Sequence, residues 1–112
     1  MRRGEVWLIN LDPSIGAEIK KTRPAVIVND DSVGVLPLKI IVPITEWKER
    51  YNVAPWMIRI EPTIENGLDK VSAADAFQVR SIDQTRMVRR LGILSELYLQ
   101  NVTKALALVL SI

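Results

Sequence analysis

The side chains that could do chemistry in this 112-residue sequence are carboxylates, Lys, Arg, Tyr and hydroxyls, because it contains no His and no Cys. The absence of Cys excludes disulfides, thiol nucleophiles, iron–sulfur clusters and thiolate zinc sites. The absence of His removes the commonest general base and metal ligand, and with them Ser-His-Asp hydrolysis. We therefore expect no metal ion and no cofactor.

Cationic side chains gather in two segments, although the formal net charge is only +2. The first segment combines cations with aromatic rings: Trp47, Lys48, Arg50 and Tyr51. The second is a cluster of arginines: Arg80, Arg86, Arg89 and Arg90. This cluster could form a phosphate track, a solvated face or a dimer contact. The net charge permits a polyanionic partner without requiring one.

The elements that must position these side chains are mostly strands. Apolar and β-branched runs predict strands at Glu5–Leu11, Ala25–Asn29, Leu38–Ile44, Trp56–Ile60, Val71–Val79 and Thr85–Leu91. Trp7 and Trp56 fall inside these patterns, so we expect both in the core. Pro43 has no N–H to donate, which predicts an edge or a bulge at that end of its strand.

A helix is predicted after the last strand. From Ser95, a suitable N-cap, the apolar period becomes helical and places one stripe of residues on a single face: Tyr98, Val102, Ala105, Leu106 and Val109. Short strands followed by one helix predict an antiparallel β-barrel with an appended helix. Residues 1–112 are expected to form one domain.

The sequence contains no predicted membrane or export segment. Its apolar runs are far shorter than the roughly 18 residues that a membrane helix needs. Met1–Asp12 lacks the order of regions that defines a signal peptide. We therefore expect a cytoplasmic protein.

Four blocks of the sequence occur in the order and at the spacing of a known set of motifs. They are Arg3–Trp7 with Leu11–Pro13, Gly16–Glu18 with Thr22–Val28, Val42–Thr45, and Gln78–Asp83 with Arg86 and Leu91–Leu106. In these blocks the sequence resembles the MazF/PemK family of toxin–antitoxin endoribonucleases. The resemblance implies a mainly β fold, an SH3-like antiparallel β-barrel with a C-terminal α-helix, working as a homodimer.

The resemblance also implies an activity, a partner and site residues. The activity is metal-independent cleavage of single-stranded RNA (mRNA) at a short recognition sequence. The partner is a cognate antitoxin, whose disordered tail occupies the RNA groove. The catalytic Arg of the family matches Arg23, its catalytic Thr or Ser matches Thr45, and the acidic residue of its first loop matches Glu18.

One position departs from the family pattern. Many members have an acidic residue directly before the Gln of the C-terminal motif, whereas this sequence has Phe77 before Gln78. Asp75 lies two residues before Phe77, and strand alternation would place it on the same face. The resemblance does not transfer the role of the missing acid to Asp75, so the residue that moves the proton stays open.

The chemistry of RNA cleavage fits these residue types. RNA carries its own nucleophile, the 2′-OH, so the protein needs to align it, help remove a proton and stabilise charge at phosphorus. An Arg guanidinium is planar, always charged and grips two phosphate oxygens. Thr45 can orient the phosphate by a hydrogen bond, and Glu18 could act as a base if it is partly buried.

Each of these residues also has an ordinary structural interpretation. Arg23 alone suits a solvated surface, Thr45 a turn or cap, and Glu18 a solvated charged loop. Their placement favours function, because Arg23 precedes one predicted strand and Thr45 follows the next. An antiparallel pair of strands would bring those two ends together.

Further residues are predicted to contact RNA, where bases stack on aromatic rings and phosphates need cations. They are Lys20, Lys21, Trp47, Lys48, Arg50, Gln78 and Arg80. Two of them have a structural alternative. Trp47 could pack over the barrel rim, and Gln78 could bond to backbone instead of a base edge.

Two other functions compete with RNA cleavage. The same barrel serves non-enzymatic toxins that poison a protein target such as gyrase, and a fold does not determine a function. Arg23 and Thr45 favour the ribonuclease, since a gyrase poison has no need of them. A weaker alternative is an RNA-binding module without catalysis.

Overall fold

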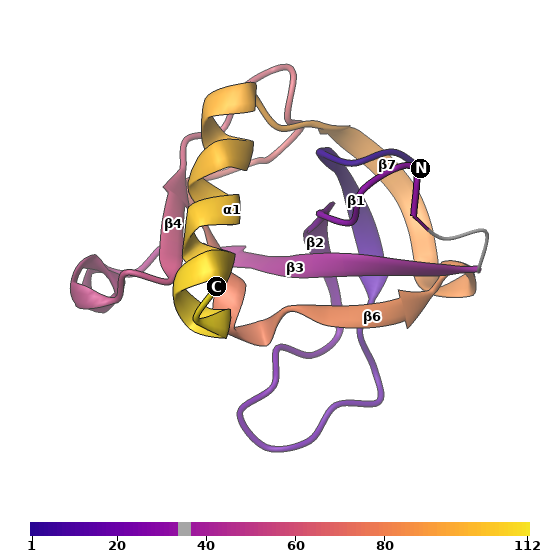
Figure 1. Ribbon diagram of the computed structural model, residues 1–112, viewed down its shortest axis with the longest axis horizontal. Coiled ribbons are helices and arrows are strands. Elements are labelled where there is room, and N and C mark those ends of the chain that lie inside the picture. The colour runs from indigo at the N-terminus through magenta and orange to yellow at the C-terminus, as the bar shows by residue number, and fades with distance from the viewer. Residues whose placement is uncertain (34–36) are drawn as a thin grey trace.

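Seven β-strands form one antiparallel sheet in the computed structural model, which describes residues 1–33 and 37–112. The strands are β1 (Glu5–Asn10), β2 (Thr22–Ile27), β3 (Leu38–Glu46), β4 (Met57–Ile60), β5 (Ser72–Asp75), β6 (Arg80–Asp83) and β7 (Met87–Ile93). The helices are three short 3-10 turns and one α-helix: η1 (Glu49–Val53), η2 (Ala76–Gln78), η3 (Gln84–Arg86) and α1 (Glu96–Leu110). Figure 1 shows α1 beside β4, at one end of the long strand β3.

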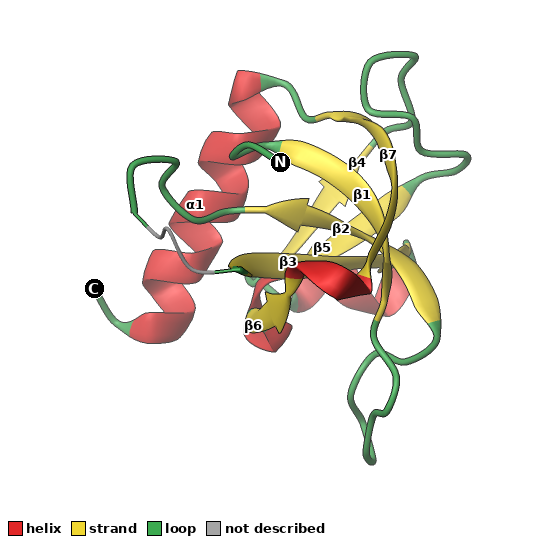
Figure 2. Cartoon of the chain, turned by 90° about the vertical axis from the view of Figure 1, so that its right-hand side faces the viewer, coloured by secondary structure: helices red, strands yellow, loops and turns green. Residues whose placement is uncertain are grey.

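The sheet is open, which corrects the prediction of a barrel. Its strands follow the order β4-β5-β3-β2-β1-β7, and within the described residues the end strands β4 and β7 are not paired with each other. The long strand β3 pairs with β6 through Leu38–Ile41 and with β5 from Ile44 to Glu46. This change of partner curves the sheet without closing it (Figure 2). The mainly β, antiparallel class with a C-terminal helix is confirmed.

Pro43 does not lie at an edge of the sheet, but the ladder is interrupted on one side of it. Pro43 is fully buried in the interior of β3, opposite Ala25 of β2. On the other side of β3, Val42 and Pro43 fall between the segment paired with β6 and the segment paired with β5. A break in the ladder tolerates a residue without an N–H, which explains how a proline fits a central strand.

Two apolar clusters cover the two faces of the sheet. One lies between the sheet and α1 and includes Val26, Val42, Leu99 and Val102. The other covers the opposite face and includes Ile9, Ile27, Ile41 and Ile82. Alternate residues of β2 therefore point into different clusters, as the period of a strand requires. The strands β2 and β3, which carry Arg23 and Thr45, are therefore packed against apolar side chains on both faces of the sheet.

Several boundaries differ from the prediction, and two of them concern site residues. β2 begins at Thr22 and β3 continues to Glu46, so Arg23 and Thr45 lie within strands instead of flanking them. The strand predicted at Val71–Val79 ends at Asp75, where the chain turns into η2 before β6 begins at Arg80.

The two tryptophans expected in the core behave differently. Trp56 is 36% exposed, so that prediction is wrong. It lies in a turn just before β4, with its ring against Phe77. Trp7 is partly buried and packs against the second cluster, while its indole N–H donates to Glu5.

The helix prediction is confirmed. The Ser95 hydroxyl accepts a hydrogen bond from the Tyr98 amide at 3.2 Å and caps α1, which buries Leu99, Val102 and Ala105. Within the part of the chain that the structure describes, we find no helix whose length and apolar character would let it cross a membrane.

Candidate active site

Arg23 and Thr45 meet where β2 and β3 run side by side. The antiparallel register pairs Ala25 with Pro43, and the same register continued by two residues places Arg23 opposite Thr45. Both residues line a pocket of about 290 Å³. The rest of its lining comes from β1, β3, β5, β7 and neighbouring loops: Leu8, Pro24, Ile44, Glu46, Gly67, Leu68, Asp69, Lys70, Ser72, Arg89 and Leu91. The structure therefore brings the two predicted catalytic residues together.

Three cations border this pocket, and their partners differ. The Lys70 ammonium lies 3.7 Å from the Glu46 carboxylate, which partly neutralises it. Arg23 lies opposite Ile9 of β1 and Arg89 lies opposite Leu8, and both arginines line the pocket although neighbouring residues of β1 face opposite sides of the sheet. Among the described residues, neither guanidinium forms an ion pair. Two arginines in the lining of one pocket suit an anion with several oxygens, such as a phosphodiester.

Glu18 lies at a different pocket. This larger hollow, of about 530 Å³, is lined by Ala17, Glu18, Ile19, Pro43, Phe77, Gln78, Val79 and Arg80. Glu18 is exposed, and its Oε1 accepts a hydrogen bond of 2.6 Å from the Ile15 amide within its own loop. The partial burial that would make it a better base is absent. The two pockets are neighbours along β3, since Pro43 lines one and Thr45 the other.

A buried carboxylate organises the wall of the larger pocket. Asp75 is 4% exposed, and its two oxygens accept hydrogen bonds from the Phe77 amide and the Gln78 side chain, both at 3.1 Å. Burial raises the pKa of Asp75 above its usual value, although these hydrogen bonds oppose the rise. The carboxyl group is therefore a fixed acceptor that shapes η2.

Gln78 uses its amide within the protein. Its side-chain oxygen accepts from the Ile19 amide at 2.6 Å, and its nitrogen donates to Asp75 and, at 3.4 Å, to the Ala17 carbonyl. These bonds tie the loop between β1 and β2 to η2. Of the two alternatives for Gln78, bonding to backbone describes this structure.

The four arginines of the cluster contact different partners. Arg80 donates to the Leu11 carbonyl at 3.4 Å, and Arg86 donates to the carbonyls of Asn10 and Asp12. Both therefore hold the chain where it leaves β1. Arg89 lines the pocket of Arg23, and Arg90 pairs with Glu5.

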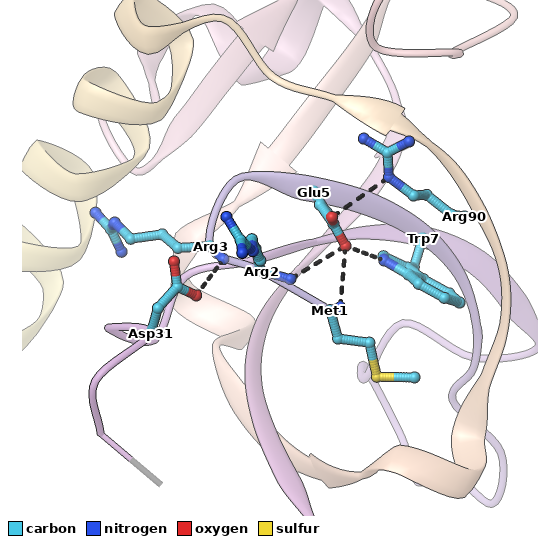
Figure 3. A network of polar contacts seen from close by, with 7 residues as sticks. All are labelled: Met1, Arg2, Arg3, Glu5, Trp7, Asp31 and Arg90. Atoms are coloured by element: carbon cyan, nitrogen blue, oxygen red, sulfur yellow. Dashed lines mark hydrogen bonds and ion pairs between the residues drawn. The ribbon is translucent and has the colours of Figure 1, made fainter.

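Glu5 is the centre of a polar network beside β1 and β7 (Figure 3). Its carboxylate accepts hydrogen bonds from the Arg2 amide at 3.1 Å and the Trp7 indole at 2.9 Å, and Arg90 approaches to 3.5 Å. Burial disfavours the charged form of Glu5, but the hydrogen bonds and the positive charges of Met1 and Arg90 outweigh it and lower its pKa. The network holds β7, and with it Arg89, against β1.

Trp47 is engaged with protein groups on its face and edge. The Arg59 guanidinium lies 5.4 Å from the centre of its ring, and the Tyr51 ring meets it edge-on at 5.8 Å. Its indole N–H is buried and has no acceptor within the described part of the chain. These contacts favour packing over base stacking for Trp47. The cations predicted to contact RNA nearby, Lys20, Lys21, Lys48 and Arg50, are exposed.

Comparison with known proteins fits this geometry. Residues 2–110 match the family described as the PemK-like, MazF-like toxin of type II toxin-antitoxin system. The chain belongs to this family. The endoribonuclease MazF9 of Mycobacterium tuberculosis is 34% identical to this family member over 118 aligned residues, covering 100% of this chain and 98% of the relative.

Solved structures of the family share the fold. MazF from Deinococcus radiodurans superposes with a TM-score of 0.82 at 23% identity, covering 100% of this chain and 97% of the other. An endoribonuclease from a mycobacterial species, solved in complex with its cognate antitoxin, gives a TM-score of 0.79 at 17% identity, covering 100% and 96%. The chain therefore shares its overall fold with these two solved structures.

Sequence reasoning missed two features of the site. The sequence identifies Arg89 only as part of a basic cluster, and its place in the lining of the pocket of Arg23 depends on the pairing of β1 with both β2 and β7. Lys70 carried no signal, because it lies in the loop before β5 and reaches the pocket through the fold. Strand alternation gives the face on which Asp75 lies, but it does not predict that the carboxylate is buried.

Proposed function

We propose that this toxin cleaves single-stranded RNA without a metal ion, at a short recognition sequence, through the 2′-OH of its substrate. RNA cleavage is the activity of the family to which the chain belongs, and the named relative at 34% identity is an endoribonuclease. The observation that carries the proposal is the pocket in which Arg23 and Thr45 lie together with Arg89.

The pocket supplies positioning and charge. Arg23 binds two oxygens of the scissile phosphate, and Arg89 adds a second positive charge as the phosphorane forms. Thr45 donates a hydrogen bond that fixes the orientation of the phosphate. The 2′-oxygen attacks phosphorus and loses its proton, and the bond from phosphorus to the 5′-oxygen breaks as that oxygen gains a proton. The products are a 2′,3′-cyclic phosphate and a 5′-hydroxyl.

The metal-independent part of the proposal rests on the side chains present. The chain has no His and no Cys, and the described residues contain no group of three or more Asp or Glu side chains placed to hold a metal ion. The guanidinium groups of Arg23 and Arg89 provide the positive charge that Mg²⁺ would otherwise supply.

Glu18 stays a prediction for proton transfer. It lies at the neighbouring pocket and is exposed, so the proposal assigns the phosphate to Arg23, Arg89 and Thr45 and leaves the general base open. A Glu18→Gln variant distinguishes the two roles, because loss of a base alters the pH dependence of kcat while loss of a loop contact does not.

The biological setting is also proposed. We infer that residues 1–112 act as one toxin domain in the cytoplasm, as a homodimer neutralised by a cognate antitoxin. The mycobacterial structure with its antitoxin supports the partner, and a two-fold axis joining two small domains would build a longer groove for RNA. Sedimentation of the purified toxin tests the dimer, and an active species of 12.7 kDa contradicts it.

The test of the proposed function is cleavage of a defined RNA in the presence of EDTA. We expect full activity in EDTA and discrete ends that map to one short sequence. Cleavage that stops in EDTA and returns with Mg²⁺ contradicts the metal-independent mechanism. Absence of cleavage by the folded wild type, combined with inhibition of gyrase, indicates the non-enzymatic alternative.

A further inference from the structure

Two aromatic side chains form an exposed pair beside the larger pocket. Phe77 is 66% exposed and Trp56 is 36% exposed, although both are large and apolar. Their ring centres lie 5.9 Å apart, with planes inclined at 59°. Exposure of these apolar rings to water is unfavourable. Exposed apolar surface of this kind often marks a binding site.

The backbone holds this pair in place. The Phe77 amide donates to Asp75, and the Ala76 amide donates to the Trp56 carbonyl at 3.1 Å. Gln78 also bonds to Asp75 and to the loop between β1 and β2. The Phe77 ring is therefore carried on a fixed turn and loses little freedom when a ligand covers it, which favours binding.

The hollow next to Phe77 has the size and chemistry of a nucleotide site. Its volume of about 530 Å³ falls within the usual range for small-ligand pockets. Arg80 contributes positive charge to its lining and Glu18 contributes a carboxylate acceptor. An aromatic face, a cation and an acceptor match a base with its phosphate and amino groups.

This hollow neighbours the proposed active site along β3. Pro43 lines it, and two residues further along β3 Thr45 lines the pocket of Arg23. Two strand residues span about 6.6 Å, at roughly 3.3 Å per residue. A single strand of RNA whose scissile phosphate lies at Arg23 can therefore place a neighbouring base at Phe77.

We propose that Phe77 stacks on an unpaired nucleobase flanking the scissile phosphate, seated in the larger pocket, and that Trp56 supports the Phe77 ring. The inference rests on the proposed RNA cleavage and adds a specificity-determining contact to it. This chain therefore selects its flanking base by stacking on Phe77.

The first experiment measures steady-state cleavage of an RNA that contains the mapped cut. Phe77→Ala and Phe77→Leu are expected to raise KM roughly 5- to 150-fold, the range that loss of one stacked base implies. The kcat is expected to stay near the wild-type value, and Phe77→Tyr is expected to restore KM. Ile64→Ala is a matched control, since Ile64 is 97% exposed and lines neither pocket.

The second experiment detects stacking directly. RNAs with 2-aminopurine at single positions around the cut are mixed rapidly with excess toxin, and fluorescence is recorded before cleavage. One flanking position is expected to be quenched by wild type and by Phe77→Tyr, but not by Phe77→Leu. If Phe77→Leu shows the same quenching and the same KM as wild type, the stacking inference is wrong. The proposed function is unaffected by that result as long as the wild type cleaves the RNA. Lack of cleavage by wild type rejects the proposed function itself.

Discussion

Arg23 carries the heaviest demand of any single residue in the proposed mechanism. It must bind two phosphate oxygens and stabilise the charge that grows on them. We expect Arg23→Ala to lower the cleavage rate roughly 10²–10³-fold, the scale for removing one transition-state donor. Arg23→Lys is expected to recover only part of this loss, because an ammonium is a point charge without the planar fork. Single-turnover cleavage of a defined RNA measures both values.

The control for Arg23 is another exposed arginine. Arg59 lies over Trp47 and pairs with Glu61 at 3.1 Å, outside both pockets. Arg59→Ala removes the same charge and is expected to change the rate by less than about threefold, because exposed ion pairs contribute little. A folded Arg23→Ala variant that cleaves at the wild-type rate removes Arg23 from the site.

The Glu5 carboxylate makes the stability of the protein depend on pH. Its pKa is lowered from 4.5, so its contribution is present above that value and is lost as pH falls through the folded-state pKa. Glu5→Gln is expected to cost about 1–2 kcal/mol of unfolding free energy at pH 7. The difference from wild type should shrink towards pH 3, as the Glu5 carboxylate of the folded protein takes up a proton. Urea unfolding at the two pH values measures it.

Glu61→Gln serves as the comparison for Glu5. Glu61 is about half exposed, and its pair with Arg59 is solvated, so this variant is expected to lose little at either pH. A loss in Glu5→Gln that is equal at pH 7 and pH 3 would mean that packing of the side chain matters and its charge does not.

At the scale of elements, the sequence predicted the strands and the helix because their periods are local. It placed their ends less well. Thr22-Arg23-Pro24 has the composition of a loop, yet β2 includes it because its partner β1 continues opposite these residues as far as Asn10. The proximity of Arg23 and Thr45 was still predicted correctly, since antiparallel pairing aligns them wherever the strand ends fall.

Two glycines with the same backbone conformation have different surroundings. Gly16 and Gly67 both have positive φ, +61° and +69°. A Cβ on Gly16 meets nothing within 4 Å, whereas a Cβ on Gly67 collides with the carbonyl group of Leu91 in β7. Gly16→Ala is expected to cost about 1 kcal/mol for its conformation alone. Gly67→Ala adds a steric clash and is expected to cost at least about 3 kcal/mol.

The comparison isolates the packing of the turn before β5 against β7. Gly67 also lines the pocket of Arg23, so this packing positions one wall of the site. Thermal or urea unfolding of the two variants gives the difference directly. An equal loss of unfolding free energy in Gly16→Ala and Gly67→Ala would show that the chain around Gly67 shifts to accommodate a methyl group.

At the scale of the whole molecule, the pairing of the strands brings the residues of the site together. Its charged lining comes from β2, β3, β7 and the loop before β5, segments that are far apart in the sequence. Local patterns cannot place Arg89 beside Arg23, because this depends on β1 pairing with β2 on one side and β7 on the other. The exposure of Trp56 was equally hidden, since alternation alone assigned it to the core.

The source of the nucleophile is a property of the whole site. The pocket offers Arg23, Arg89, Lys70 and Thr45, and the chain contains neither Cys nor a His to activate a hydroxyl. The proposed nucleophile is therefore the 2′-OH on the 5′ side of the scissile bond. Replacing that one ribose by deoxyribose is expected to abolish cleavage while binding persists, because phosphate contacts and base stacking remain. Deoxyribose at the next position is the control and should be cut.

The ends of the fragments test the same mechanism independently. The upstream fragment should carry a 2′,3′-cyclic phosphate or the 3′-phosphate derived from it, and the downstream fragment should begin with a 5′-hydroxyl. Mass spectrometry of both fragments distinguishes these ends. A 5′-phosphate, or efficient cutting at the deoxy position, means that water or the protein attacks phosphorus. Arg23 and Arg89 would then have to stabilise a different transition state, and a 5′-phosphate would identify the 3′-oxygen as its leaving group.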